Sequence, residues 1–144
     1  MSALLDVLRR AGRFDDTLVV VASDHGEEFF EHGHGGHGFE LYEESVHVPL
    51  IVAGPGVAHG AVLRHPVGLV DLMPTLLDLA GIQVPTGLDG TSQVRGIRAG
   101  TKALSHDPSH GYYAETAPGT VRMLRTQSFK ILRWRDPARA RNRQ

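Results

Sequence analysis

Apolar positions near the start of the chain follow two different spacings. Residues 3–11 carry apolar side chains at the period of an α-helix, and Gly12 follows where such a helix would end. Residues 17–22 form a continuous β-branched and apolar run, which is typical of a strand covered by helices on both faces. The pattern therefore predicts a helix followed by a buried strand.

Helix-type and strand-type spacings continue to alternate over the following sixty residues or so. Apolar positions predict a short helix within 39–45, a second buried strand at 48–53, and another extended segment over 62–70. A helix is expected over 72–80, with Asp71 placed to cap its first turn. This order predicts an α/β fold with a partial, mostly parallel sheet flanked by helices.

The last part of the chain has a different pattern. Residues 81–111 are rich in glycine, proline, serine and threonine, which predicts connecting loops with room for one short helix. Three short strands are expected at 112–115, 120–125 and 129–134, and a turn joins the last two. We therefore expect a small C-terminal antiparallel sheet.

Length and composition are those of a globular chain of single-domain size. Its 144 residues are 41% hydrophobic and 22% charged. We divide them into an α/β part, residues 1–92, and a loop-rich connection with the small antiparallel sheet, residues 93–144. No apolar run is long enough to cross a bilayer and the first residues do not resemble a signal peptide, which leaves the compartment open. The absence of cysteine excludes disulfides and thiolate metal ligands in this segment.

Polar chemistry gathers directly after the first predicted strand. Asp24 and His25 follow that strand, and three further histidines lie in the glycine-rich loop behind them: His32, His34 and His37. In parallel sheets, ligands bind at the edge where the strands end. Carboxylate oxygens and neutral imidazole nitrogens are common ligands of divalent cations, so Asp24 and His25 are candidate ligands of one metal ion. An isolated pair of this kind would more often be a loop-capping aspartate beside a hydrogen-bonded histidine.

A series of short motifs occurs in order along the chain. They are Ser-Asp-His-Gly-Glu-Glu at 23–28, His-Gly at 32–33, Gly-His-Gly at 36–38, Leu-Tyr-Glu-Glu at 41–44, His-Val-Pro-Leu-Ile-Val at 47–52, Gly-Pro-Gly at 54–56, Val-Asp-Leu-Met-Pro-Thr-Leu-Leu-Asp-Leu-Ala-Gly at 70–81 and Asp-Gly-Thr-Ser at 89–92. This ordered set resembles the C-terminal part of sulfatases of the alkaline-phosphatase-like superfamily. The resemblance implies an alkaline-phosphatase-like core and a small antiparallel sheet near the C-terminus.

The resemblance also bears on the metal. Many sulfatases have Asp-Asn in the place of Asp24 and His25 and hold Ca²⁺, which prefers oxygen ligands. The Asp-His pair is similar to relatives that cleave phosphate and phosphonate esters, and imidazole shifts the preference toward Mn²⁺ or Zn²⁺. We therefore expect one divalent ion, Ca²⁺, Mn²⁺ or Zn²⁺, bound by Asp24 and His25 together with acids of the upstream part of the family.

By the same resemblance, His37 stands where many sulfatases have a lysine that binds the sulfate group. A histidine there would donate a proton or a hydrogen bond to an ester oxygen or to the leaving group, so His37 is the candidate catalytic and substrate-binding residue. His32 is a second candidate for substrate binding, whereas His34 is interpreted as loop surface. Three neighbouring acids are left unassigned, since such groups can be additional metal ligands but more often are outer partners of a metal or face solvent: Glu27, Glu28 and Glu31.

The chain carries no recognisable nucleophile of the family. Sulfatases use Cys or Ser within Cys/Ser-x-Pro-Ser-Arg, matured to formylglycine, and the nearest string here, His-Asp-Pro-Ser-His at 106–110, differs at both ends. We therefore expect a formylglycine or serine nucleophile upstream, and interpret the chain as the C-terminal fragment of a metal-dependent sulfatase-like hydrolase of sulfate esters, inactive in isolation. The alternatives are a phosphodiester or phosphonate hydrolase, or a phospho-group transferase, of the same superfamily, and a non-catalytic metal-binding module.

The charge pattern bears on possible partners. The net charge is −1, and the basic end around Trp134 contains Arg133, Arg135, Arg139, Arg141 and Arg143. We interpret this end as a solvated strand running into a terminus, because aromatic residues do not alternate with its arginines as they do in nucleic-acid surfaces. The expected partner is a small-molecule or glycan ester of sulfate or phosphate, with no nucleic acid and no membrane segment.

Overall fold

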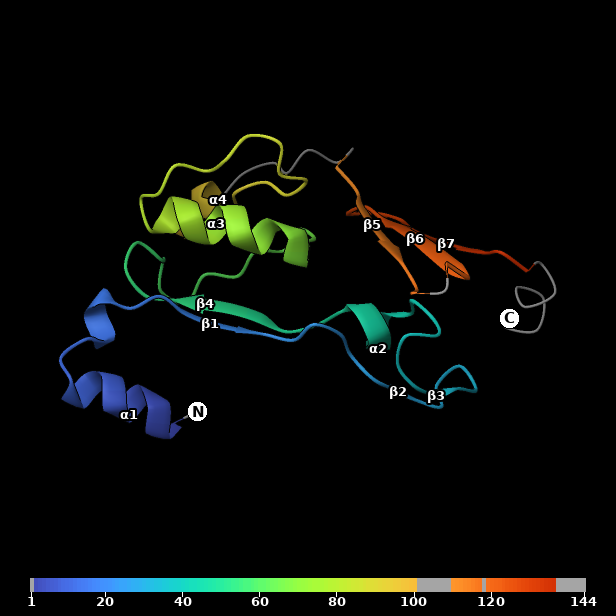
Figure 1. Cartoon of the computed structure of the whole chain (residues 1–144), viewed down its shortest axis with the longest axis horizontal. Helices are drawn as coiled ribbons and strands as arrows, with labels where there is room; N and C mark the ends of the chain where they lie inside the picture. The colour runs from blue at the N-terminus through green and yellow to red at the C-terminus, as the bar shows by residue number, and fades with distance from the viewer. Residues whose placement is uncertain (1, 101–109, 118, 137–144) are drawn as a thin grey trace. The chain divides into compact units, whose positions relative to one another are not determined.

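The computed structural model describes residues 2–100, 110–117 and 119–136, and these form two compact units (Figure 1). Each unit is assembled from separate stretches of the chain. Among the described residues, the first unit comprises those up to Val21, Leu50–Arg64 and Gly68 to Gly100. The second comprises Ala22–Pro49, His65–Val67 and the residues from His110 onward. The site loop expected from the sequence belongs to the second unit and is described within it.

Helices and one small sheet make up the first unit. The sheet pairs β1 (Val19–Ala22) with β4 (Leu50–Ala53), at the positions of the two expected strands. The expected burial on both faces is not observed, because no residue of either strand is fully buried and Ile51 is 59% exposed. The helical elements, in chain order, are α1 (Ser2–Arg10), the short 3-10 helices η1 (Phe14–Asp16) and η2 (Leu69–Asp71), α3 (Leu72–Leu79) and α4 (Val94–Ala99). Within the described residues β1 and β4 pair only with each other. The wider, mostly parallel sheet therefore stays a prediction, as does the division into residues 1–92 and 93–144.

Two expectations around α3 are wrong. The segment 62–70 contains no strand and instead ends in η2, since Pro66 lacks the N–H that a strand ladder requires. Asp71 does not cap α3, because η2 runs directly into α3 and Asp71 already has helical dihedrals, φ −78° and ψ −13°. Its buried carboxylate instead accepts a hydrogen bond from the N–H of Gly68 at 3.3 Å, at the start of η2. It also accepts hydrogen bonds from the N–H of Thr91 at 2.8 Å and from Nε2 of Gln93 at 3.2 Å. Asp71 therefore anchors a distant loop.

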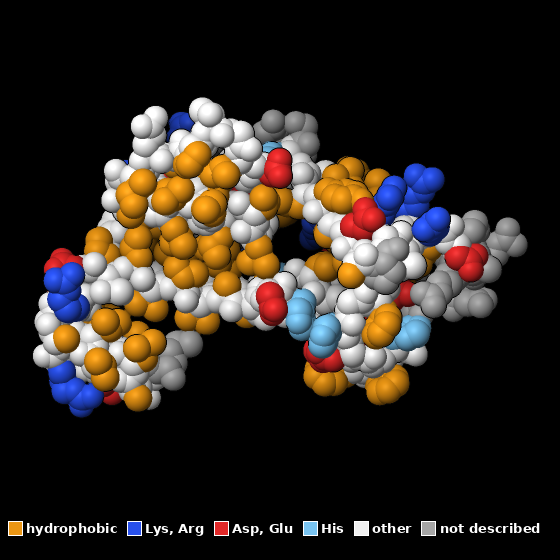
Figure 2. Space-filling model, viewed as in Figure 1, with side chains coloured by type: hydrophobic (Ala, Val, Ile, Leu, Met, Phe, Trp, Pro, Cys, Tyr) orange, Lys and Arg blue, Asp and Glu red, His pale blue; other side chains and the backbone are white. Residues whose placement is uncertain are grey.

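Apolar side chains gather over α3 (Figure 2). They line a shallow groove on this helix and the residues beside it: Leu69, Leu72, Met73, Leu76, Leu77, Ala80 and Ile82. Met73 is 61% exposed and Ile82 is 56% exposed. Within the described residues, this helix therefore keeps one apolar face open.

The second unit contains the antiparallel sheet that was expected near the C-terminus. Its strands β5 (Tyr112–Glu115), β6 (Val121–Arg125) and β7 (Lys130–Trp134) pair in the order β5-β6-β7. A smaller antiparallel pair, β2 (Glu28–Phe29) with β3 (Gly35–Gly36), and the one-turn helix α2 (Glu43–Val46) lie in the first stretch of the unit. The predicted C-terminal sheet is therefore confirmed, whereas the β2–β3 hairpin was not expected.

A small core joins these elements of the second unit. Leu41, Val121 and Met123 are buried together, and four partly buried side chains pack against them: Val46, Ala114, Leu132 and Trp134. Nε1 of Trp134 also donates a hydrogen bond to Oε2 of the buried Glu40 at 2.8 Å. The segment that follows the histidine-rich loop is thus attached to the face of the C-terminal sheet.

Two segments named in the sequence analysis are not among the described residues. Residues 106–109 of the nucleophile-like string and the arginines beyond Asp136 lie outside the described residues. None of the described helices is long and apolar enough to span a membrane.

Candidate functional site

The turn after β1 is held against α2. The N–H of Gly26 donates to the carbonyl of Ser45 at 2.9 Å. A Cβ at Gly26 would lie 1.8 Å from the carbonyl oxygen of Glu44, so a side chain cannot be accommodated without moving the backbone. Glycine at this position therefore allows the turn to approach α2 closely, and the turn presents Asp24 and His25.

Asp24 and His25 place their donor atoms close together. Nδ1 of His25 contacts the carbonyl oxygen of Gly26 at 2.9 Å, and because a carbonyl only accepts, Nδ1 carries the proton and Nε2 keeps its lone pair. Nε2 of His25 lies 3.7 Å from Oδ2 of Asp24. The backbone N–H of His25 donates to Oδ1 of Asp24 at 3.0 Å, and this hydrogen bond is the main cause that lowers the pKa of Asp24 below 3.8. The pair thus offers a carboxylate oxygen and an imidazole lone pair.

This pair fits a divalent cation. Metal–oxygen and metal–nitrogen bonds of about 2.0–2.2 Å from two atoms 3.7 Å apart can meet at one ion. Both side chains are exposed, so a cation and further ligands can reach them. The donor chemistry is the N/O set that suits Mn²⁺ or Zn²⁺ and is less suited to Ca²⁺.

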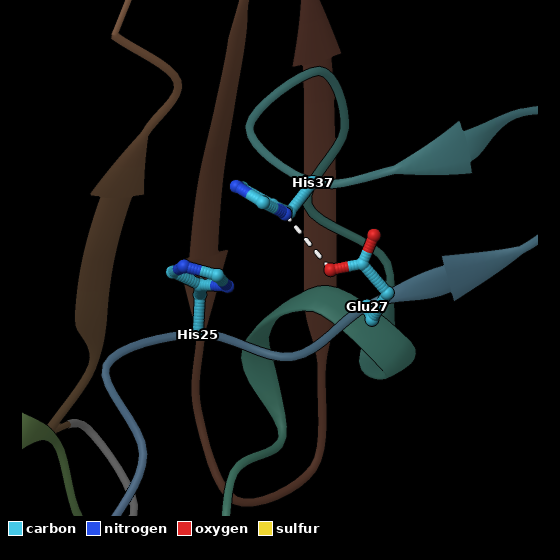
Figure 3. A group of neighbouring side chains, drawn as sticks. All are labelled: His25, Glu27 and His37. Carbon is cyan, nitrogen blue, oxygen red and sulfur yellow. Dashed lines mark hydrogen bonds and ion pairs between the residues drawn. The ribbon is translucent and has the colours of Figure 1, made fainter.

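His37 lies beside His25 (Figure 3). Its ring stacks on the ring of His25, with 4.1 Å between centroids and 23° between planes. Its Nδ1 lies 2.8 Å from Oε2 of Glu27. His25, Glu27 and His37 each offer a ligand atom within 4.8 Å of the others, so the chain forms a His/Glu group of a kind that can bind metal. The structure therefore brings His25 and His37 together with a glutamate that the sequence reasoning left unassigned.

The sequence itself contains a signal that relates Glu27 to His25. It lies two residues after His25, and in extended chain residues two apart point to the same side. It also directly precedes β2, whose pairing with β3 aligns Glu28 with Gly36. Continuing that register by one residue places Glu27 opposite His37, which only the hairpin pairing reveals.

His32 belongs to a different set of contacts. Its ring stacks on Tyr42, with 3.6 Å between centroids and 6° between planes, and its Nδ1 contacts Oε1 of Glu44. These contacts join His32 to the start of α2, and His32 is not among the grouped side chains around His25. Its role in substrate binding stays a prediction.

The remaining acids of the loop are not equivalent. Glu28 is 2% exposed, and its Oε1 accepts a hydrogen bond from Oγ of Ser45 at 2.8 Å. Oε2 of Glu31 accepts from the N–H of Phe29 at 2.6 Å. Both carboxylates therefore bind protein groups of the loop and of α2, which supports a structural role for each.

The sequence of the chain matches a known family model. A family model described as Sulfatase matches residues 1–82. The chain belongs to the sulfatase family. The resemblance seen in the ordered motifs is thereby confirmed, and sulfate ester hydrolysis is the general reaction of the family.

Relatives of known name cover most of this sulfatase segment. Arylsulfatase K of Homo sapiens is 43% identical over 142 residues, which are 93% of this chain and 25% of the relative. Arylsulfatase K of Bos taurus is 40% identical over 145 residues, which are 96% of this chain and 27% of the relative. The choline-sulfatase of Rhizobium meliloti is 38% identical over 117 residues, which are 77% of this chain and 22% of the relative. The chain thus spans about a quarter of the length of the curated relatives it matches.

Solved structures include both sulfatases and phosphonate hydrolases. A 2-O GAG sulfatase has a TM-score of 0.78 at 29% identity, with 94% of this chain and 31% of that chain covered. The phosphonate monoester hydrolase of Silicibacter pomeroyi has a TM-score of 0.76 at 29% identity, with 92% and 29% covered. The described fold is accordingly that of the sulfatases and their alkaline-phosphatase-like relatives.

Proposed function

We propose that this chain is the C-terminal part of a metal-dependent sulfatase that hydrolyses sulfate esters. The observation that carries the proposal is the group formed by Asp24, His25 and His37, in which two metal-type donor atoms lie 3.7 Å apart and a second imidazole stacks on the first. In this proposal Asp24 and His25 bind one divalent ion, and His37 contacts the sulfate group.

In this proposal, each residue of the site contributes a different donor atom. The cation would supply positive charge for the nucleophile and for an ester oxygen. Asp24 is a carboxylate at neutral pH, and the N–H of His25 lowers its pKa further below 3.8, so it would offer the ion a full negative charge. Nδ1–H of His25 is held by the carbonyl of Gly26, which directs the Nε2 lone pair to the same ion.

His37 would act on the ester. Its Nδ1 faces Glu27, so the ring nitrogen that remains for the substrate is Nε2. When Nε2 also carries a proton, it can donate to an ester oxygen or to the departing alcohol. The nucleophile itself, a formylglycine or a serine, would come from a part of the protein outside this segment, in keeping with relatives about four times as long.

The substrate would be a small molecule or a glycan that carries a sulfate ester. One related solved structure is a complex with the substrate D-glucosamine-2-N,6-O-disulfate, and another relative is a choline-sulfatase. These relatives differ in the alcohol part of their substrates, so the family alone supports the sulfate group and not the alcohol.

Hydrolysis of phosphonate or phosphate esters is the second candidate function. It is supported by the 29% identity to a phosphonate monoester hydrolase and by the imidazole ligand of the Asp-His pair. A non-catalytic metal-binding module is the third, and it predicts metal binding without turnover of either ester.

The test is an enzyme in which residues 2–136 of this chain replace the matching segment of human arylsulfatase K. Purified chimera is assayed with 4-nitrophenyl sulfate and with 4-nitrophenyl phenylphosphonate, and its bound metal is measured by mass spectrometry. Sulfate turnover greater than phosphonate turnover supports the first proposal, and the reverse ratio supports the second.

The metal assignment is tested in the same enzyme. Asp24→Ala and His25→Ala should each lower bound metal and turnover together, because each removes one donor atom. His34→Ala, in the same loop but outside the grouped side chains, is the matched control and should retain both. Normal metal content in both ligand variants would refute the assignment.

A further inference from the structure

We propose that Glu27 is a positioning residue for His37, holding the imidazole so that Nε2 faces the ester group. This inference rests on the role proposed above for His37. It assigns a function to a carboxylate that belongs to the motif at 23–28 and has no role in the proposed function above.

The first argument is the contact itself. Oε2 of Glu27 lies 2.8 Å from Nδ1 of His37, within hydrogen-bond distance. An ionised carboxylate only accepts hydrogen bonds, so Nδ1 carries the proton and the Nε2 edge stays available. Carboxylates that accept from the far nitrogen of a functional histidine determine its tautomer and its ring orientation in other sites.

The second argument is the backbone that produces the contact. β2 and β3 pair antiparallel with Glu28 opposite Gly36, and Glu27 and His37 are the residues that directly flank this last pair. Directly opposed residues of an antiparallel pair have neighbouring side chains. The contact therefore follows from the register of the hairpin and does not depend on a chance meeting of two flexible side chains.

The third argument is that the side chain of His37 needs a partner to restrain its orientation. His37 is half exposed and stands between Gly36 and Gly38, whose φ values of +104° and +82° lie in the left-handed region. A side chain on such a glycine-flanked loop would otherwise sample many orientations, which lowers catalytic efficiency. The carboxylate of Glu27 restrains the ring edge, and the stacked ring of His25 restrains the ring plane.

A metal ion shared by His25, Glu27 and His37 is the competing explanation of the same cluster. An imidazole lone pair lies in the ring plane, so a shared ion would have to lie close to both planes. Planes tilted by 23° with centroids 4.1 Å apart intersect far beyond a metal–nitrogen bond length of about 2.1 Å. The stacked arrangement therefore favours a positioning role for Glu27.

The first test reads the tautomer of His37 without any turnover. Long-range ¹H–¹⁵N spectra of the 144-residue chain are recorded with a chelator at about pH 8.5, above the ordinary imidazole pKa of about 6.5. We expect the Nδ1–H form in the parent and in Glu27→Gln, whose amide oxygen still accepts, and a mixture of tautomers in Glu27→Ala. The matched control Glu44→Ala removes the partner of His32 and should leave His37 unchanged. An unchanged tautomer in Glu27→Ala would overturn the proposal.

The second test uses the chimeric enzyme. Glu27→Ala should lower kcat/KM by about 10- to 100-fold with bound metal unchanged, and Glu27→Gln should recover most of the loss. Glu31→Ala, which removes a carboxylate of the same loop, should stay within about twofold of the parent.

The decisive comparison is made in a His37→Ala background. There Glu27→Ala should produce no further loss, because Glu27 acts through His37. A further loss of equal size, or a loss of bound metal in Glu27→Ala alone, would overturn the positioning role. An inactive parent chimera instead refutes the proposed function, whereas the tautomer measurement stands apart from it.

Discussion

The hydrogen bond between Trp134 and Glu40 is expected to contribute strongly to the stability of the second unit. Glu40 is 1% exposed, and its Oε2 accepts from Nε1 of Trp134 at 2.8 Å. Glu40 follows the histidine-rich loop, whereas Trp134 ends β7, so one contact joins two segments 94 residues apart. We expect Trp134→Phe to destabilise the chain, because phenylalanine keeps an aromatic ring but has no donor.

The expected loss in the free energy of unfolding follows from the burial of the Glu40 carboxylate. Leaving Oε2 of Glu40 without its donor in a buried place costs about 1–3 kcal/mol. The smaller ring also leaves part of the apolar contact with the core unfilled, which adds about 1 kcal/mol. Together these predict a loss of about 3 kcal/mol in the free energy of unfolding.

The assay is urea unfolding of the chain followed by far-ultraviolet circular dichroism, since Trp134 is the only tryptophan and its fluorescence is absent from the variant. The set comprises the parent, Trp134→Phe, Glu40→Leu and the double variant. Replacing both partners by apolar groups removes the unsatisfied acceptor, so the double variant should lose less than the sum of the single losses. Phe129→Leu, at a side chain that is 70% exposed, is the control and should change stability by less than about 0.5 kcal/mol.

Two results would refute this reasoning. One is a loss below about 0.5 kcal/mol in Trp134→Phe, which would mean that the buried acceptor finds another donor at little cost. The other is strict additivity of the two single losses in the double variant, which would mean that Glu40 and Trp134 contribute independently.

Three further predictions concern the loop, a surface ion pair and the isolated chain. Gly26→Ala should cost about 3 kcal/mol or more in urea unfolding, because its Cβ would lie 1.8 Å from the backbone oxygen of Glu44, whereas Gly33→Ala, at φ +78° in open space, should cost about 1 kcal/mol; equal losses would contradict the close approach. The hydrogen bond from Lys130 lowers the pKa of Glu43 below 4.5, so its stabilisation is complete above pH 4.5 and is lost as the pH falls through the lowered value. Because Glu43 is half exposed, Glu43→Gln should cost at most about 1 kcal/mol at neutral pH and nothing in strong acid, and a loss that is the same at both pH values would contradict the ion pair. The purified 144-residue chain should not hydrolyse 4-nitrophenyl sulfate, and metal-dependent turnover by this chain alone would refute its interpretation as a fragment.

Local patterns predicted most of the elements. The helical spacing of residues 3–11 corresponds to α1, and the alternating runs near the C-terminus correspond to β5, β6 and β7. These elements form from side-chain periodicity and turn residues that are neighbours in the chain, so the sequence carries the information directly. The ordered motifs indicated the sulfatase family for the same reason, since each one is a short contiguous string.

The contacts that build the site depend on tertiary structure. Glu27 meets His37 because of the β2–β3 register, and Trp134 meets Glu40 across most of the chain. Asp71 was expected to cap α3, whereas its carboxylate accepts from Gly68 at the start of η2 and from Thr91 some twenty residues away. Hydrogen-bonding groups have several local partners of similar free energy, and the one that forms is decided by which segments the folded backbone brings within about 3 Å. The sequence thus determined the family, the local elements and the candidate residues, whereas the fold decided which of those residues act together.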